Sequence, residues 1–169
     1  MITYITENEI DDLKAKYLRQ LTADVNDPEM LLEMELEEYG IENFTVNPDG
    51  SIDVNGDVNM YNKGLTKIPF KFGKVGGYFY CSYNPALTSL KGAPKSVGTD
   101  FYCSNNPALT SLEGAPKSVG GYFYCSYNPA LTSLDGAPES VTGSFYSRHN
   151  KFTEEEIRAV CNVKGKVYV

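Results

Sequence analysis

The sequence predicts a repeat solenoid, in which short parallel strands stack on one another along the chain. Segments 75–96 and 119–140 agree at 20 of 22 positions, and segments 75–96 and 97–118 agree at 18 of 22. Each copy alternates inward and outward residues over the length of a strand and then continues into Asn-Pro and Gly-Ala-Pro turns. Such a fixed period is typical of repeats that each add one layer to a stack.

Weaker copies on both sides extend the repeat to about six rungs. The strand pattern returns at 141–147 and again at 163–169, while 65–69 and 58–60 provide the upstream copy, the latter one residue out of register. A period of 22 residues lies within the roughly 20–29 residues of leucine-rich repeats, which provide one strand and one return segment each. We therefore expect a leucine-rich-repeat solenoid over residues 53–169.

Residues 1–52 predict an N-terminal cap that begins with two helices. Thr6 and Glu9 have the spacing of a capping box, Asp27-Pro28 begins a second helix, and Gly40 ends it. The apolar face of the first helix consists of Ile10, Leu13, Tyr17, Leu18 and Leu21.

A hairpin and a late helix complete the expected elements. FTVNPDGSIDV alternates around an Asn-Pro-Asp-Gly turn and predicts a hairpin that leads into the solenoid. Near the other end, Thr153 and Glu156 predict a short helix over 154–161 in place of the usual return segment. Because a stack of repeats leaves an apolar end exposed, we expect the helices and hairpin of residues 1–52 to cover it.

Composition and charge exclude several classes of partner. The chain has 169 residues, 41% hydrophobic and 22% charged, without an apolar run long enough for a membrane helix and without a signal-peptide pattern at its start. We expect a cytoplasmic location. Residues 1–47 have a net charge of -9 and the remainder a net charge of +2. A chain without a basic stripe is not expected to bind nucleic acid directly.

Three of the four cysteines recur at the repeat period, and none of the four forms a CxxC pair. We interpret them as packed, reduced thiols rather than as disulfides or metal ligands, and we expect no cofactor. They are Cys81, Cys103, Cys125 and Cys161.

Alternation decides which residues face outward. Position 78 becomes Asp100 in the second copy, and an unpartnered aspartate is costly to bury, so this side of each strand is expected to be outward. The inward ladder is then Phe79, Phe101, Phe123, Phe145 and Val167, beside Cys81, Cys103, Cys125, Ser147 and Val169. Further scaffold positions are Leu87, Leu109, Leu131, Leu90, Leu112 and Leu134, with an asparagine ladder of Asn84, Asn106, Asn128 and Asn150.

The outward ladder predicts a partner-binding surface. Its tyrosines are Tyr80, Tyr102, Tyr124, Tyr146 and Tyr168, flanked by Tyr78, Tyr122, Tyr83 and Tyr127, with Asp100, Asn105, Arg148 and His149 at equivalent positions. Neighbouring aromatic rings also stabilise a sheet by stacking, and this is the alternative interpretation. Because Thr or Val would serve the sheet equally well, the tyrosines favour binding.

The repeat FYCSNNPALTSLEGAPKSVGG resembles the leucine-rich-repeat proteins encoded by tailed bacteriophages. The segments FTVNPDGSIDVNGDV, LTKIPFKFGKV and FTEEEIRAVCNVKG share this resemblance, which covers roughly residues 40–169. The resemblance implies synthesis in the cytoplasm of an infected bacterium and no particular reaction. It also suggests a host protein as the partner, with inhibition of a host defence or control protein as the result.

Enzymatic chemistry is not expected. The single histidine, His149, occupies the position equivalent to Tyr127 at a strand edge, and Asp100 is two rungs away from it. The recurring glycines belong to solenoid turns rather than to a phosphate-binding loop.

Two other functions remain open. An acidic surface on the second helix can occupy a nucleic-acid-binding groove in place of DNA, and its residues would be Glu29, Glu33, Glu35, Glu37 and Glu38. Alternatively, the strand at 163–169 can present an open edge that pairs with a second copy to form a homodimer.

Overall fold

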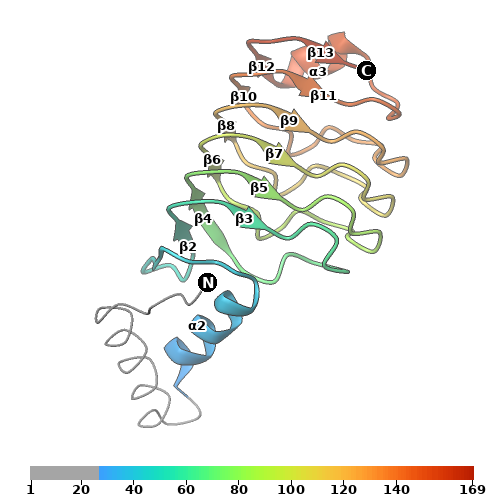
Figure 1. Cartoon of the computed structure of the whole chain (residues 1–169). Coiled ribbons are helices and arrows are strands. Elements are labelled where there is room, and N and C mark those ends of the chain that lie inside the picture. Colours follow the sequence, from blue (N-terminus) through green and yellow to red (C-terminus); the bar gives the residue numbers. More distant parts are fainter. Residues whose placement is uncertain (1–26) are drawn as a thin grey trace, which may run out of the picture. The chain divides into compact units, whose positions relative to one another are not determined.

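The computed structural model describes residues 27–169 (Figure 1). Contacts divide the chain into two compact units, Met1–Glu38 and Tyr39–Val169. The described part of the first unit contains helix α2 (Pro28–Glu38). Among the described helices, none has the length and apolar character needed to cross a membrane. The second unit contains β1 (Phe44–Val46), β2 (Ile52–Val54), β3 (Val58–Asn59), β4 (Phe72–Val75), β5 (Phe79–Tyr80), β6 (Ser96–Val97), β7 (Phe101–Tyr102), β8 (Ser118–Val119), β9 (Phe123–Tyr124), β10 (Ser140–Val141), β11 (Phe145–Tyr146), α3 (Glu154–Val160), β12 (Asn162–Val163) and β13 (Val167–Tyr168).

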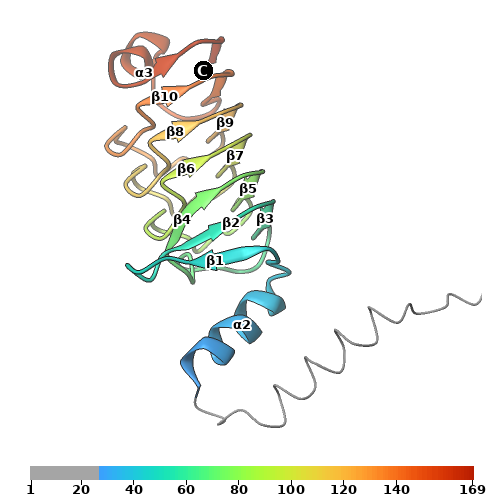
Figure 2. The same cartoon turned by 90° about the vertical axis from the view of Figure 1, so that its left-hand side faces the viewer.

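The second unit is a β-solenoid built from two sheets. Sheet A has the strand order β1-β2-β4-β6-β8-β10-β12, and sheet B has the order β13-β11-β9-β7-β5-β3. Figures 1 and 2 show the turns stacked one above another, with the two sheets along the stack. Phe79 pairs with Phe101, and Phe101 with Phe123, which confirms the 22-residue period. The six strands of sheet B are connected by five turns of chain.

Each full turn provides two short strands, where the sequence predicted one. The predicted strand over 75–81 bends at Gly76-Gly77, so Val75 ends a strand of sheet A and Phe79 begins one of sheet B. Close stacking favours glycine at this corner: a Cβ atom on Gly98 would lie 2.1 Å from the carbonyl oxygen of Gly76. The bend places the Phe-Tyr segment of each turn in a sheet of its own.

The elements before the repeats agree with their prediction where the structure describes them. Helix α2 begins after Asp27, whose carboxylate accepts the N–H of Glu29 at 3.0 Å, and Gly40 follows its end at a φ of 67°. The hairpin forms through antiparallel pairing of β1 with β2, and β2 then pairs in parallel with β4. The hairpin is therefore part of sheet A, and the domain boundary that we expected at residue 52 falls at the start of β2. The predicted helix after Thr6 lies outside the described residues, and the capping role stays a prediction.

The core follows the predicted inward ladder. The side chains of Phe79, Phe101, Phe123 and Phe145 are fully buried, as are those of Cys81, Cys103, Cys125 and Ser147. The prediction was wrong for Val169, which is 56% exposed, because it follows the edge strand β13 and no described strand packs beyond it. Among the leucines of the return segments, Leu87, Leu109, Leu131, Leu90 and Leu112 are buried and Leu134 is half-buried.

Buried asparagines satisfy the backbone of the turns. Asn84 accepts the N–H groups of Lys63 and Leu65 at 3.0 Å each and donates to the carbonyl of Met60 at 2.9 Å. Asn106 and Asn128 are also fully buried and donate to neighbouring cysteine carbonyls. This arrangement confirms the asparagine ladder, because these turns would otherwise bury unpaired polar groups.

Two local features complete the scaffold. At Gly92, φ is 100° and a Cβ atom would lie 2.5 Å from the carbonyl oxygen of Phe70, so the Gly-Ala-Pro turn requires glycine. Helix α3 has the predicted capping box, in which Thr153 accepts the N–H of Glu156 at 3.2 Å and donates its own N–H to the Glu156 carboxylate at 2.8 Å.

All four cysteines are buried free thiols. Burial raises the pKa of Cys125 to about 12 and that of Cys161 to about 11. Thiols with such values are poorly nucleophilic at neutral pH, which agrees with a packing role. Within residues 27–169, no group of three or more His, Cys, Asp or Glu side chains is arranged to hold a metal ion.

Candidate protein-binding surface

The tyrosine ladder lies along the outer side of sheet B. Parallel register aligns Tyr80 with Tyr102, Tyr102 with Tyr124, Tyr124 with Tyr146, and Tyr146 with Tyr168. Consecutive rings stack with centroids 4.4 to 4.5 Å apart and interplanar angles of 6 to 13°. The predicted outward ladder is therefore present, with all five rings half-buried.

Stacking determines which part of these rings a partner can reach. Each inner ring of the ladder has both faces covered by its neighbours, so the ladder presents ring edges and hydroxyl groups. Burial raises the pKa of Tyr124 and Tyr146, and burial together with the Asp100 carboxylate raises that of Tyr102. The hydroxyls remain protonated at neutral pH: that of Tyr102 donates to Asp100, and those of Tyr124 and Tyr146 hydrogen-bond to the next tyrosine of the ladder.

Two flanking tyrosines are more exposed and lie out of line with the stack. Tyr78 is 36% exposed and Tyr122 is 42% exposed. The Tyr78 ring is tilted by 38° from Tyr80, and the Tyr122 ring is tilted by 57° from Tyr124. Their ring faces are not enclosed by a parallel neighbour, in contrast to the rings of the ladder.

Two further tyrosines follow the strands in a strained backbone conformation. Tyr83 and Tyr127 are 48% and 49% exposed, with φ values of 62° and 60°. The equivalent Asn105 has a φ of 58°, and asparagine is one of the few residues that adopt this left-handed region readily. A bulky residue there costs about 1–3 kcal/mol. The chain therefore places tyrosine where its own repeats show that asparagine fits with less strain.

The polar residues of the predicted surface have partners within it. Asp100 accepts the N–H of Tyr122 at 2.6 Å and the hydroxyl of Tyr102 at 2.9 Å. His149, also left-handed at a φ of 61°, stacks on Tyr127 with centroids 4.2 Å apart. The guanidinium of Arg148 lies 5.3 Å from the ring centroid of Tyr168. These contacts fix the polar groups in place along the surface.

One exposed aromatic residue was missed by sequence reasoning. Tyr61 is 47% exposed, and its ring lies 5.0 Å from that of Tyr83. Tyr61 lies 22 residues before Tyr83, so the repeat period could have found it, although strand β3 pairs Val58 with Phe79 at a spacing of 21 residues. We call the tyrosine face the outer side of sheet B and the turns after it, with Tyr61, Tyr78, Tyr80, Tyr83, Tyr102, Tyr122, Tyr124, Tyr127, Tyr146 and Tyr168.

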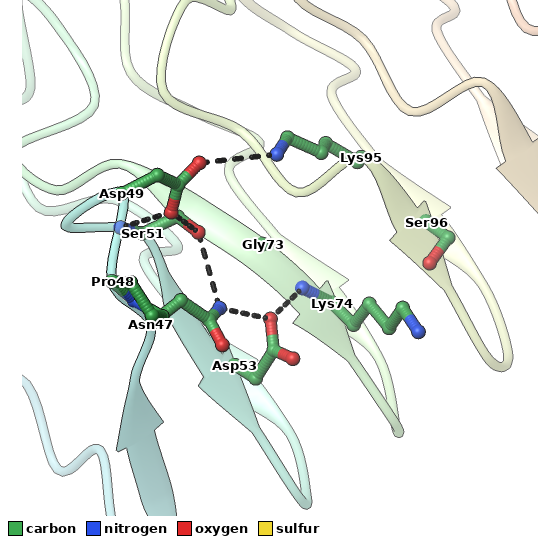
Figure 3. A pocket seen from close by; sticks show the side chains of 9 residues that line it. All are labelled: Asn47, Pro48, Asp49, Ser51, Asp53, Gly73, Lys74, Lys95 and Ser96. Atoms are coloured by element: carbon green, nitrogen blue, oxygen red, sulfur yellow. Dashed lines mark hydrogen bonds and ion pairs between the residues drawn. The ribbon is translucent and has the colours of Figure 1, made fainter.

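A second candidate is a polar hollow beside the hairpin (Figure 3). Its volume is about 450 Å³. Figure 3 shows the side chains of the hairpin turn pointing toward those of the next two turns. The lining residues are Asn47, Pro48, Asp49, Ser51, Asp53, Gly73, Lys74, Lys95 and Ser96.

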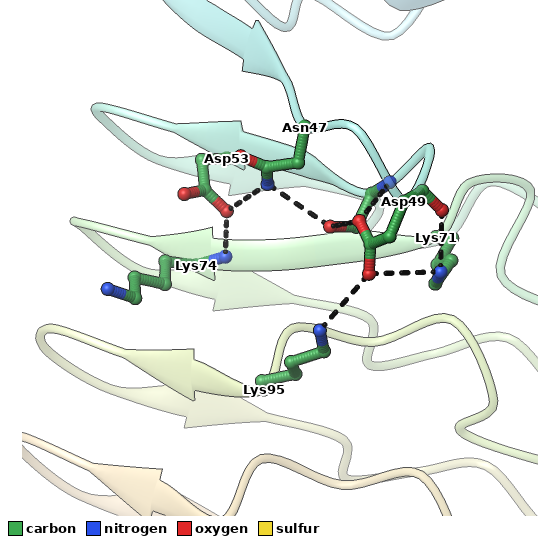
Figure 4. Close-up of polar contacts among 7 residues, drawn as sticks. Asn47, Asp49, Asp53, Lys71, Lys74 and Lys95 are labelled. Carbon is green, nitrogen blue, oxygen red and sulfur yellow. Dashed lines mark hydrogen bonds and ion pairs between the residues drawn. The ribbon is translucent and has the colours of Figure 1, made fainter.

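The polar groups of this hollow bind one another (Figure 4). The Asn47 amide donates to Asp53 at 3.0 Å, and Asp53 also accepts the backbone N–H of Lys74 at 2.7 Å. Asp49 forms ion pairs with Lys71 at 3.2 Å and Lys95 at 3.4 Å. The network joins the hairpin to the first complete turns.

The same contacts determine the chemistry of the hollow. Hydrogen bonds from Ser51 and Lys71 hold the pKa of Asp49 well below its usual range, so this carboxylate is a weak base at neutral pH. A general base works best with a pKa near the working pH. The hollow is therefore better suited to joining the hairpin to the repeats than to proton transfer.

The acidic candidate surface is exposed on α2. All five predicted glutamates, Glu29, Glu33, Glu35, Glu37 and Glu38, are exposed. With 3.6 residues per turn, Glu29, Glu33 and Glu37 fall on one side of the helix. Glu35 and Glu38 fall on the opposite side. Mimicry of a nucleic acid by this helix stays a prediction.

Comparison of the chain with protein families, with curated proteins and with solved structures gave no match.

Proposed function

We propose that this chain is a non-enzymatic protein-binding module whose tyrosine face binds a protein partner. The observation that carries the proposal is the left-handed conformation of Tyr83 and Tyr127 combined with their exposure. Strained residues persist where function requires the side chain, and exposed tyrosines are frequent anchors of interfaces. A solenoid also presents such residues rigidly, which lowers the entropy lost on association.

The remaining features of the proposal come from the sequence. We assign the solenoid to the leucine-rich-repeat class because of its 22-residue period and its asparagine ladder. By its resemblance to bacteriophage proteins, the partner would be a protein of the bacterial host, located in its cytoplasm. Binding would inhibit a host defence or control protein by occlusion, without chemistry on a substrate.

The experiment is affinity capture from bacterial lysate with the full chain and two variants. Replacing Tyr83 and Tyr127 with asparagine leaves the ladder intact and introduces the residue that Asn105 provides at the equivalent position. Val160→Ala is the matched control, because it removes a half-exposed apolar side chain from α3, outside the tyrosine face. We expect a partner that the wild type and the control retain and the double variant loses.

The affinity of the purified partner for the wild type and the double variant then measures the size of the effect. Interface anchors contribute 2 kcal/mol or more on truncation, so the Kd should rise by about 30-fold or more. Equal capture by the double variant and the wild type would show that these tyrosines are scaffold, and the acidic helix α2 would become the next surface to test.

A further inference from the structure

We propose that the segment bound by the tyrosine face is proline-rich and adopts the polyproline II conformation. This inference rests on the proposed function and specifies the chemistry of the partner. It is based on how the exposed tyrosines are spaced and on which of their surfaces are free.

Two pairs of exposed tyrosines are each two turns apart. Tyr78 and Tyr122 are 44 residues apart and occupy equivalent positions, and Asp100 occupies the same position in the turn between them. Two strand separations of about 4.8 Å place equivalent positions about 9.6 Å apart. A polyproline II helix repeats every three residues, with a rise of about 3.1 Å each, and therefore presents the same side every 9.3 Å or so.

A second pair of tyrosines repeats this spacing at the strand ends. Tyr83 and Tyr127 are also two turns apart, with Asn105 at the same position between them. Short side chains thus separate bulky rings in both rows, and we call the positions of Asp100 and Asn105 between these rings slots. An extended β-strand, with same-side residues about 6.6–6.8 Å apart, would fall out of step with this spacing.

The free ring faces suit proline rings. Ladder rings are covered by parallel neighbours, but Tyr78 and Tyr122 are tilted from theirs and expose more of their surface. Aromatic surfaces of this kind bind proline-rich segments in several domain types, because the preformed helix loses little entropy on binding.

The test selects peptides from a random library of 12-residue sequences on the immobilised full chain. We expect selected peptides with prolines three residues apart. Their affinity should fall at least tenfold when Tyr78 and Tyr122 are both replaced by serine, the residue that Ser144 provides at this position. Alanine at the spaced prolines should weaken binding to a similar extent.

A second variant separates this inference from general aromatic adhesion. Asp100→Tyr combined with Asn105→Tyr fills both slots with the residue that neighbouring turns already carry, and it increases the aromatic area. The inference predicts at least a tenfold loss of peptide affinity, whereas an unspecific aromatic patch would bind more tightly. Circular dichroism before and after the substitutions establishes that both variants are folded.

Two results would overturn the inference. The first is a selection without proline spacing, and the second is tighter binding by the slot-filling variant. If lysate capture still depends on Tyr83 and Tyr127 in either case, the proposed function stands and only the polyproline partner is rejected. If capture does not depend on these residues either, both proposals fail.

Discussion

The guanidinium of Arg158 donates to the carbonyl of Val163 at 2.9 Å and, through its other terminal nitrogen, to that of Gly165 at 3.1 Å. One turn earlier, the equivalent carbonyls of Val141 and Gly143 accept backbone N–H groups from the following turn. Arg158 thus occupies the acceptors that another turn would use. Edge strands with free acceptors promote association between chains, so this residue protects the edge of sheet A at β12.

Arg158→Ala should promote self-association and lower the free energy of unfolding by about 1–2 kcal/mol, since two charge-assisted hydrogen bonds at a partly exposed site are lost. Sedimentation velocity over a range of concentrations and chemical denaturation measure the two effects. Arg158→Lys is the control, because an ammonium group cannot reproduce the fork that binds both carbonyls. If the Arg158→Ala variant remains monomeric wherever the wild type does, Arg158 does not protect the edge.

The predicted homodimer would form at the edge of sheet B, because β13 is an edge strand of that sheet and pairs only with β11. The carbonyls of Lys166 and Tyr168 accept backbone N–H groups of the preceding turn. The N–H and carbonyl of Val167 therefore face away from that turn. If the dimer forms there, Val167→Pro should abolish it, because proline removes the donor. A sedimentation coefficient that is the same for both proteins at all concentrations would exclude this dimer.

Tyr83→Asn should stabilise the protein, by about 0.5–1 kcal/mol, because asparagine adopts the left-handed region with less strain. The reciprocal change Asn105→Tyr should destabilise it by a similar amount. Thermal or chemical denaturation measures whether the first variant is stabilised and the second destabilised. Destabilisation by Tyr83→Asn would show that the contact of Tyr83 with Tyr61 outweighs the strain, and would weaken the argument that the side chain is retained for binding.

Asn106→Ala should be among the more destabilising substitutions, costing about 3 kcal/mol or more, because it leaves several buried groups without partners. The side chain accepts the N–H of Asn84 at 2.8 Å and donates to the carbonyls of Cys81 and Cys103. Urea denaturation measures the loss. Asn105→Ala, at the half-buried neighbouring position, is the control, and an equal effect of the two would contradict the ladder's role.

The repeat made much of this architecture predictable. Phe79, Phe101 and Phe123 recur at one period, so the inward side of the strands and the stacking direction follow from the sequence. The capping box of Thr153 and Glu156 similarly predicted α3, because both partners lie within four residues of each other.

Other features were hidden for physical reasons. Glycines within a strand pattern fit a bulge as well as a corner, so the bend at Gly76-Gly77 could not be deduced. Asparagine or glycine usually indicates a left-handed conformation in a sequence. Tyrosine does not, so the conformation of Tyr83 and Tyr127 could not be predicted.

The tyrosine ladder should also be visible in its titration. Burial raises the pKa of Tyr124 and Tyr146, and burial with the nearby Asp100 carboxylate raises that of Tyr102. Because the folded-state values lie above the ordinary value of 10.0, the neutral phenols contribute stability that is complete below that pH. This contribution is lost as the pH rises through the folded-state values.

Ultraviolet absorbance of tyrosinate during alkaline titration should therefore show a later group that comes from Tyr102, Tyr124 and Tyr146. Asp100→Asn removes the negative charge beside Tyr102 and should move only part of the later group to lower pH. Addition of urea should move this later group to lower pH, because both the burial and the proximity of Asp100 disappear on unfolding. A native titration that superimposes on the unfolded one would mean that the hydroxyls of these three tyrosines are fully hydrated in the folded protein, which would contradict their burial in the ladder.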